Sequence, residues 1–361
     1  MKKTNIPAFI ALALAFVLTI IISSGTAIAA PKRVLLRLQQ AYSASLPILG
    51  TGFAWWAEQL KEASDGALAV KIYEPGKLVK AFEILDAVSD GKIDCGAATA
   101  GFWAGKIPAA PIFSSLPFGP EAPEYMAWMF HGNGLKLNQE MYDQAGYNVK
   151  VLPTVMLVPE TAGWFSEPIE SIEDLKGLKM RFFGYGGQVM QKLGMSISLM
   201  PPAELFPALE KGVLDATEFS MPTIDQRLGF YKIAQYNYFP GWHQQATWVD
   251  VLINKDKWNS LSKGQQKLIE MVSMASIVNS ISDGEASQGP IIRENAEKRG
   301  VKNMYWSDSM LEQFKKAWED VSAEMSAKDP FYKKAYKDLS DFRSEYEFWG
   351  SLGFLPRNCV K

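Results

Sequence analysis

The sequence predicts an α/β protein folded into two lobes. The chain has 361 residues, which is more than a single hydrophobic core usually supports. Near its start, short apolar segments alternate with amphipathic ones, and this βαβα rhythm is typical of a mostly parallel sheet covered by helices. A helix–glycine–strand pattern occurs twice, around Gly91 and around Gly212. The repeat marks either two lobes of related architecture or simply a common kind of junction.

The first elements follow from their hydrophobic periodicity. Val34–Leu38 is predicted to be a strand, and 52–63 a helix because its apolar residues recur every three or four positions. Leu68–Tyr73 alternates as a strand does, and Phe82–Val88 is again helical. Gly91 ends this second helix and leads into a further short strand.

The C-terminal part is predicted to be helical. It carries two apolar stripes at helical spacing: Leu311, Phe314, Trp318 and Val321, then Ala335, Leu339, Phe342, Tyr346 and Trp349. The second stripe is aromatic enough to indicate docking. We therefore expect about 308–361 to form helices that pack on the lobes or on a second subunit, which would make a homodimer.

The N-terminus has the pattern of an export signal. Lys2 and Lys3 precede an apolar run over 6–22, and Ala27–Ala29 fits the small-residue rule for cleavage before about Ala30. We expect 1–29 to be a signal peptide, and the competing interpretation is an uncleaved membrane anchor. No later stretch is apolar enough for a second span.

Composition and motifs exclude several classes of function. The chain has 37 Lys and Arg residues and 39 Asp and Glu residues, and it is therefore not basic overall. This argues against a nucleic-acid-binding protein. Hydrolase, kinase and dinucleotide motifs are missing. His131 and His243 are the only histidines, which argues against a zinc site or a catalytic triad. Cys95 and Cys359 could pair in an oxidising compartment, but we expect no bond between a buried strand and a tail.

Several residues could hold a small anion. Arg181 lies in a short apolar strand, where it offers a planar fork to a carboxylate or else simply faces solvent. Glu218 and Phe219 follow a strand predicted near 213–217, and ligands of open α/β sheets favour such strand ends. Two aromatic loops, 101–108 and 238–245, could form cleft walls or belong to the core.

Six motifs follow one another along the chain: WAGKIPAA at 103–110, LPFG at 116–119, DLKGLKMR at 174–181, PALEKGVLDATE at 207–218, LGFYK at 228–232 and PGW at 240–242. In their order and spacing, these motifs resemble those of the substrate-binding proteins of TRAP transporters (tripartite ATP-independent periplasmic transporters). The resemblance covers nearly all of the chain beyond the signal. It is strongest to the branch that binds 2-oxo and 2-hydroxy monocarboxylates.

The resemblance implies a two-lobed periplasmic-binding-protein fold with mixed sheets, hinge strands and long bridging helices. It implies that Arg181 holds the ligand carboxylate and that a sodium or calcium ion bridges ligand and protein. At two of the cation positions this chain has exchanged the acid and the amide, with Glu160 where relatives have Gln and Gln244 where they have Glu. Phe219 replaces the usual Trp.

These observations together give one functional hypothesis. The protein is expected to be a periplasmic solute-binding protein that delivers a small organic monocarboxylate to the integral membrane subunits of a TRAP transporter. The ligand-binding residues would be Arg181, Glu160, Phe219, Gln244, Tyr42, Phe102, Trp103 and Trp242, and the cation would be held by Glu160, Glu218, Phe219 and Gln244. We expect 30–155 with about 248–300 to form lobe 1 and 156–247 to form lobe 2. The alternatives are a binder that presents its ligand to a receptor, or an exported carboxylate-acting enzyme.

Overall fold

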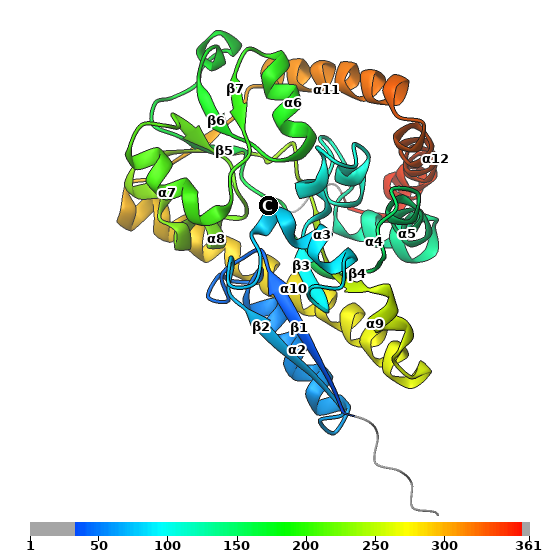
Figure 1. Ribbon diagram of the computed structural model, residues 1–361. Coiled ribbons are helices and arrows are strands. Elements are labelled where there is room, and N and C mark those ends of the chain that lie inside the picture. The colour runs from blue at the N-terminus through cyan, green and yellow to red at the C-terminus, as the bar shows by residue number, and fades with distance from the viewer. Residues whose placement is uncertain (1–32, 356–361) are drawn as a thin grey trace, which may run out of the picture.

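Two mixed sheets form the centres of two lobes in the computed structural model, which describes residues 33–355 (Figure 1). The first sheet has the strand order β2-β1-β3-β10-β4, and the second has the order β11-β9-β5-β8-β6-β7. We call the parts built on these sheets lobe 1 and lobe 2. The α/β, two-lobed fold class is thereby confirmed.

The first sheet begins as the sequence predicts and then reverses direction. β1 (Val34–Gln40) pairs in parallel with both β2 (Leu68–Tyr73) and β3 (Cys95–Ala98). β10 (Thr247–Asn254) then pairs antiparallel with β3 and with β4 (Val149–Leu157). The βαβα segment therefore forms the parallel pairs that the sequence predicts, and four of the five strands run in one direction. The sheet is mixed because β10, which re-enters lobe 1 from lobe 2, runs opposite to its neighbours.

Lobe 1 is covered by short helices that carry the predicted apolar faces. α2 buries Phe53, Trp56 and Leu60, as the periodicity indicates. The helices of this lobe are α2 (Thr51–Ala63), η1 (Ala81–Glu83), α3 (Ile84–Ser89), η2 (Ala100–Trp103), η3 (Ala110–Phe113), α4 (Ala122–His131), α5 (Gly134–Gln144) and α9 (Lys255–Asn259).

Lobe 2 is built from very short strands. Its strands are β5 (Gly163–Phe165), β6 (Lys179–Arg181), β7 (Ser196–Ser198), β8 (Ala216–Thr217), β9 (Tyr236–Phe239) and β11 (Lys302–Tyr305). Its helices are η4 (Ile172–Leu175), α6 (Gly184–Lys192), α7 (Pro202–Glu210), α8 (Pro222–Leu228) and η5 (Phe230–Lys232). Gly91 and Gly212, the two glycines of the repeated pattern, have φ values of +72° and +65°, a backbone conformation that favours glycine at a helix end.

The chain crosses between the lobes after β4 and again before β10, and a third element spans them. α10 (Lys263–Arg299) has 37 residues and packs on β4 and α2 of lobe 1 and on α8 of lobe 2. Its Gly284 allows close approach, because an added Cβ would lie 3.1 Å from Val158. The long bridging helix that the family resemblance implies is therefore present.

Two further helices follow β11. α11 (Asp308–Lys328) packs on α6 of lobe 2, and α12 (Pro330–Gly353) packs on α4 and α5 of lobe 1 (Figure 1). α11 buries Phe314, Trp318 and Val321, three residues of the predicted stripe. The predicted signal segment 1–29 and Cys359 lie outside the described residues. No helix within 33–355 combines the length and the apolar character that crossing a membrane requires.

Candidate ligand and cation site

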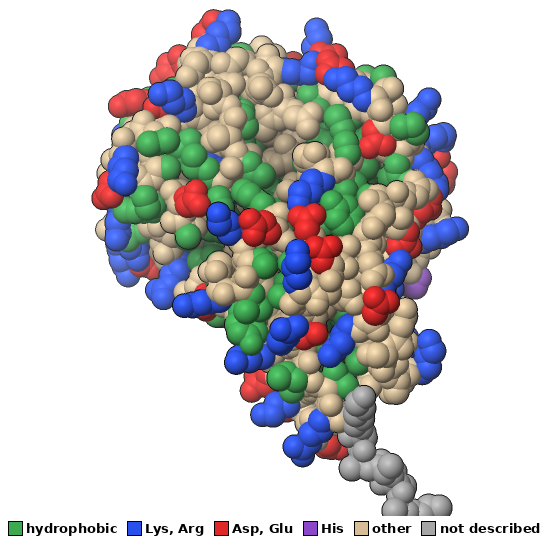
Figure 2. Space-filling view, viewed as in Figure 1, with side chains coloured by type: hydrophobic (Ala, Val, Ile, Leu, Met, Phe, Trp, Pro, Cys, Tyr) green, Lys and Arg blue, Asp and Glu red, His purple; other side chains and the backbone are tan. Residues whose placement is uncertain are grey.

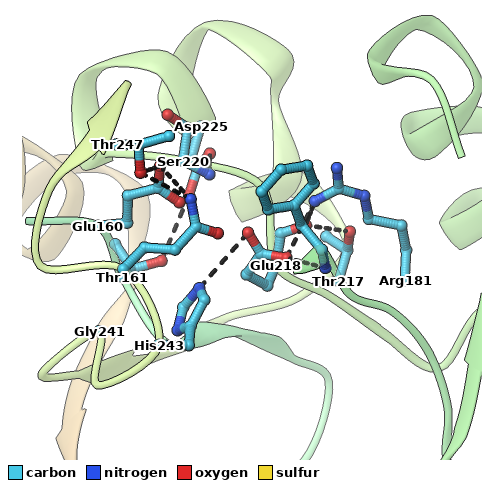
Figure 3. Close-up of polar contacts among 12 residues, drawn as sticks. Glu160, Thr161, Arg181, Thr217, Glu218, Ser220, Asp225, Gly241, His243 and Thr247 are labelled. Atoms are coloured by element: carbon cyan, nitrogen blue, oxygen red, sulfur yellow. Dashed lines mark hydrogen bonds and ion pairs between the residues drawn. The ribbon is translucent and has the colours of Figure 1, made fainter. Parts of the chain in front are cut away.

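The candidate site lies where the ends of several strands meet at the boundary between the lobes. Arg181 ends β6, and Glu218 directly follows β8, which pairs in parallel with β6. Glu160 comes from the crossing after β4, and Gln244 from the crossing before β10. Figure 3 shows these segments converging on one group of buried polar side chains.

Arg181 is buried, with a relative exposure of only 1%. Its Nη1 donates to the backbone oxygen of Glu218 over 2.6 Å and to Glu218 Oε2 over 3.0 Å. Its guanidinium lies 5.2 Å from the centre of the Phe219 ring, a stacking distance. Nε makes no hydrogen bond with any described residue. The interpretation of Arg181 as an inward side chain is confirmed, and part of its donor capacity is free.

Glu218 is held in its charged form by its neighbours. The backbone N–H of Phe183 donates to Oε2 over 3.0 Å, and His243 Nε2 lies 3.5 Å from Oε1. Burial opposes ionisation, but the charge of Arg181 and the contact with His243 outweigh it, so that the pKa of Glu218 lies below its ordinary value.

Glu160 has the opposite electrostatic environment. Gln244 Nε2 donates to its Oε1 over 3.0 Å, and Thr247 Oγ1 donates to the same atom over 3.2 Å. Burial raises the pKa of Glu160 well above its ordinary value, and the nearby carboxylates of Glu218 and Asp225 raise it further. A positive charge beside Glu160 would reverse this shift.

Four buried oxygens at the site make no hydrogen bond with any described residue. They are Glu160 Oε2, Glu218 Oε1, Gln244 Oε1 and Ser220 Oγ. Ligand atoms of Glu160, Glu218 and His243 all lie within 4.8 Å of one another. Buried polar atoms are normally paired, so this cluster indicates a missing partner. Carboxylate and amide oxygens suit hard cations such as sodium and calcium, and the residues present therefore fit such an ion.

A small cavity lined by buried side chains adjoins these oxygens. Its volume, counted as the space that the centre of a water molecule can reach, is about 20 Å³. This is little more than one ordered water requires. Six of the residues predicted to bind the ligand or the cation line it: Tyr42, Phe102, Glu160, Arg181, Phe219 and Gln244. The other lining residues are Leu49, Thr99, Leu157, Phe183, Ser220, Thr247 and Val249. Burial raises the pKa of the Tyr42 hydroxyl, which therefore stays protonated as a hydrogen-bond donor.

Two of the predicted pocket residues do not reach this cavity. Trp103 is buried in lobe 1, where its Nε1 donates to the Tyr142 hydroxyl over 3.1 Å. Trp242 stacks on Phe118 and packs against Phe314 of α11, with ring centroids 5.6 Å and 5.0 Å apart. The backbone turn at 240–242 sends the indole into this aromatic cluster, and the residues after it, 243 and 244, face the site.

Two residues of the site were not predicted from the sequence. His243, to which the sequence assigned no role in ligand or cation binding, is buried against Glu218. Its position directly after the PGW motif was the available signal. Asp225 is also buried, and it accepts from Trp164 Nε1 over 2.8 Å and from the backbone N–H of Ser220 over 3.0 Å. It thus fixes the loop that follows Glu218. No sequence pattern indicated Asp225.

Comparison with known proteins decides the family. The family model described as bacterial extracellular solute-binding protein, family 7, matches residues 41–329. This chain belongs to that family. The family consists of solute-binding proteins of transport systems, so that the exported-enzyme alternative is set aside, and the resemblance to TRAP solute-binding proteins is confirmed.

Individual relatives agree with this assignment. The chain is 33% identical over 299 residues to a monocarboxylate 2-oxoacid-binding periplasmic protein of Nostoc sp., covering 83% of this chain and 81% of that protein. A TRAP solute-binding protein from Pseudoalteromonas atlantica, with bound sodium and pyruvate, superposes with a TM-score of 0.85 at 32% identity, covering 89% of this chain and 97% of that one.

Two further solved structures are similar. A TRAP solute-binding protein from Colwellia psychrerythraea, with bound calcium and pyruvate, has a TM-score of 0.85 and 32% identity over 89% of this chain and 98% of that one. A Bordetella bronchiseptica protein, a mixed-occupancy dimer with copurified calcium and picolinate in one site, has a TM-score of 0.86 and 28% identity over 89% and 95%.

Proposed function

We propose that this protein binds a small 2-oxo or 2-hydroxy monocarboxylate such as pyruvate, together with a sodium or calcium ion, and delivers it in the periplasm to the membrane subunits of a TRAP transporter. The observation that carries the proposal is the buried Arg181 beside a cluster of unpaired oxygens. Arg181 offers its free donors to an anion, and the oxygens offer a place for a cation. Relatives that resemble this chain over most of its length hold such a pair.

Charge balance supports a ligand that carries one negative charge. Among the buried titratable side chains at the site, Arg181 is paired with Glu218, and Glu160 adds a second carboxyl group. Burial raises the pKa of the third carboxyl group, Asp225, well above its ordinary value, which favours its neutral form. A bound cation would compensate the charge of Glu160, and a monocarboxylate could then share the cation and Arg181. A dicarboxylate would bring a further charge into a buried cavity that offers it no partner.

The cation would be held by the free side-chain oxygens of Glu160, Glu218 and Gln244. The Phe219 backbone oxygen would be the fourth ligand. Such an ion would supply a fixed positive charge that polarises the ligand oxygens. The role of this chain is then to orient the ligand. Tyr42 and Phe102 would close the cavity from lobe 1, while Arg181 and Phe219 would hold the carboxylate from lobe 2.

Binding would be linked to movement of the lobes. The cavity is lined from both lobes, so that ligand and cation favour the closed arrangement by their differential affinity for it. We assign 30–155 with about 248–300 to lobe 1 and 156–247 to lobe 2, joined at the crossings near Glu160 and Gln244. The closed form would then be the one that docks on the membrane subunits.

The C-terminal helix would pair two copies of the protein. Five large apolar side chains near the end of α12 are more than half exposed: Phe348, Trp349, Leu352, Phe354 and Leu355. An exposed apolar group of this kind is typical of an interface. We propose that it forms a homodimer.

Native mass spectrometry of the purified protein, with metal analysis, tests the ligand and the cation together. We expect a copurified monocarboxylate and one sodium or calcium ion per chain. Calorimetry with pyruvate should then show binding that chelation of calcium and removal of sodium weaken. Failure to bind any 2-oxo or 2-hydroxy monocarboxylate in the presence of either ion would contradict the proposal.

A further inference from the structure

A wide groove runs along the boundary between the lobes, outside the buried cavity. Its volume, counted in the same way as that of the cavity, is about 700 Å³, compared with about 20 Å³ for the cavity. Lobe 1 contributes 41–46 and 75–83, and lobe 2 contributes 199–204 and 227–228. Figure 2 shows apolar side chains among scattered charges along this boundary.

Cavity and groove share one wall. Tyr42 lines the cavity, while its neighbours Ala41 and Ser43 line the groove. Phe102 lines the cavity and packs edge-on against Phe82, which lines the groove, with ring centroids 5.2 Å apart. Two aromatic rings in contact, Phe102 on the cavity side and Phe82 on the groove side, therefore lie between the two spaces, and Phe82 is only partly buried.

The lining of the groove is suited to binding an aliphatic chain. Its lining is mainly apolar and includes Leu46, Leu199 and Pro202. The four charged residues at the groove are two bases and two acids, Lys80 and Arg227 against Glu83 and Glu204. Their charges balance, so that the groove offers no net attraction for a second carboxylate.

The cavity, at about 20 Å³, has to widen even for pyruvate and a cation, and it has no room for a long chain. Its polar side is occupied by Glu160, Arg181 and Gln244, and its remaining walls are packed side chains. A carboxylate anchored at Arg181 with a tail of several carbons must therefore place the tail beyond the cavity. Phe82 and Phe102 join the two spaces at this wall, because Phe102 lines the cavity and Phe82 lines the groove.

We propose that the groove is the outer compartment of the ligand site, and that it receives the hydrocarbon tail of a 2-oxo or 2-hydroxy monocarboxylate whose head group lies at Arg181. The inference rests on the proposed function and extends it to acids of about six to eight carbons. Phe82 is the side chain that moves to admit the tail and then covers it. Each methylene taken out of water into the groove contributes about fourfold in affinity.

Calorimetry with pyruvate, 2-oxohexanoate and 2-oxooctanoate tests the proposal on the full-length mature protein, with calcium present. We expect 2-oxohexanoate to bind at least tenfold more tightly than pyruvate. Leu199→Glu, at a partly exposed position in the groove, should weaken binding of 2-oxooctanoate at least tenfold and leave pyruvate unaffected. Phe82→Ala should act in the opposite direction and strengthen binding of 2-oxooctanoate relative to pyruvate. Val213→Glu, at an exposed position outside the groove, is the matched control and should change neither affinity.

The outcomes separate this inference from the proposed function. Binding of pyruvate without binding of the longer acids, or an equal effect of Leu199→Glu on all three acids, would overturn the tail site and leave the proposed function standing. Absence of binding for all three acids would overturn both. If Leu199→Glu abolished uptake by reconstituted membrane subunits with every ligand affinity unchanged, the groove would be a docking surface for the transporter, and the tail site would be wrong.

Discussion

Gln244 Nε2 donates a hydrogen bond to Glu160 Oε1 over 3.0 Å, and this bond joins the two crossings between the lobes. Because the amide nitrogen and Oε1 are occupied with each other, Gln244 Oε1 and Glu160 Oε2 remain without a hydrogen bond in the described part of the chain. The hydrogen bond uses the amide donor of Gln244, so that the atoms which the pair leaves available to a ligand are two oxygens. That arrangement is suited to a cation and ties cation binding to the relative position of the crossings.

The first prediction concerns the charge of this pair. Glu160→Gln should lower the affinity for calcium at least tenfold, because it removes a full negative charge from a buried ligand set. The double variant Glu160→Gln with Gln244→Glu restores the charge at the neighbouring position and should recover most of the affinity. Calcium titration followed by calorimetry measures both effects.

Glu167→Gln is the matched control for that series, since Glu167 is exposed and lies outside the cavity. It should leave calcium affinity unchanged. Equal calcium affinity in wild type and Glu160→Gln would remove Glu160 from the ligand set.

A second prediction concerns Arg181. Arg181→Lys keeps the charge but loses the planar fork, and it should weaken pyruvate binding at least tenfold. Arg181→Ala should also destabilise the fold, by about 3–5 kcal/mol, because it leaves Glu218 buried without its partner. Calorimetry and thermal unfolding separate the two effects.

The comparison variant for Arg181 is Arg37→Ala. Arg37 forms a partly exposed ion pair with Asp94, 3.1 Å long, of a kind that contributes about 0–1 kcal/mol. Arg37→Ala should therefore change neither the affinity for pyruvate nor the free energy of unfolding appreciably. A fully active Arg181→Lys protein would show that the carboxylate is held elsewhere.

The fold could be predicted in outline because much of it is local. The range of β2 and the apolar face of α2 follow from periodicity alone. The direction of β10 does not, because a strand carries no local signal for the partner it finds after the chain has crossed to lobe 2 and returned. The strand that the sequence predicts after Gly212 is present as β8, but it has only two residues, a length that the local pattern does not determine.

The site was predictable only in part for a similar reason. Arg181 could be recognised as an inward residue of an apolar strand, but its pairing with Glu218 depends on the register that sets Arg181 opposite Thr217. His243 gives no signal of its own, since a single histidine in an aromatic turn is compatible with any environment. The positions of Trp103 and Trp242 depend on how the loops pack, which composition does not determine.

The third prediction concerns pH. Asp250 lies on β10 with its carboxyl group buried, and burial raises its pKa from 3.8 to about 8, although the nearby Asn138 side chain acts in the opposite direction. The folded state therefore keeps a proton that the unfolded state releases, and the free energy of unfolding should fall as pH rises from about 4 to about 8. The contribution of this one group over that range is on the order of 5 kcal/mol.

Asp250→Asn removes the titrating group and keeps its shape, so it should flatten this decline. Urea unfolding at pH 5 and pH 8 measures the change, and the variant should gain stability relative to wild type at the higher pH. Asp283→Asn, at an exposed position of α10, is the control and should follow the wild-type slope. Parallel slopes for Asp250→Asn and wild type would mean that Asp250 does not carry the proton.

The last prediction concerns the exposed end of α12. Arg343 fixes the middle of this helix on lobe 1, because its Nε donates to Glu124 over 2.9 Å and its Nη1 donates to the Phe118 backbone oxygen over 2.9 Å. The following turns carry Phe348 and Leu352, exposed by 70% and 72%, and nothing in the described chain covers them. Replacing both by Ser should weaken the dimer at least tenfold, because their burial is the main apolar gain of the contact. Sedimentation velocity over a range of concentrations measures this shift, and Val213→Ser, at an exposed apolar position on lobe 2, should leave it unchanged. Since these residues lie away from Arg181, pyruvate affinity should stay as in wild type. A wild-type protein that sediments as a monomer at high concentration would contradict the role given to α12.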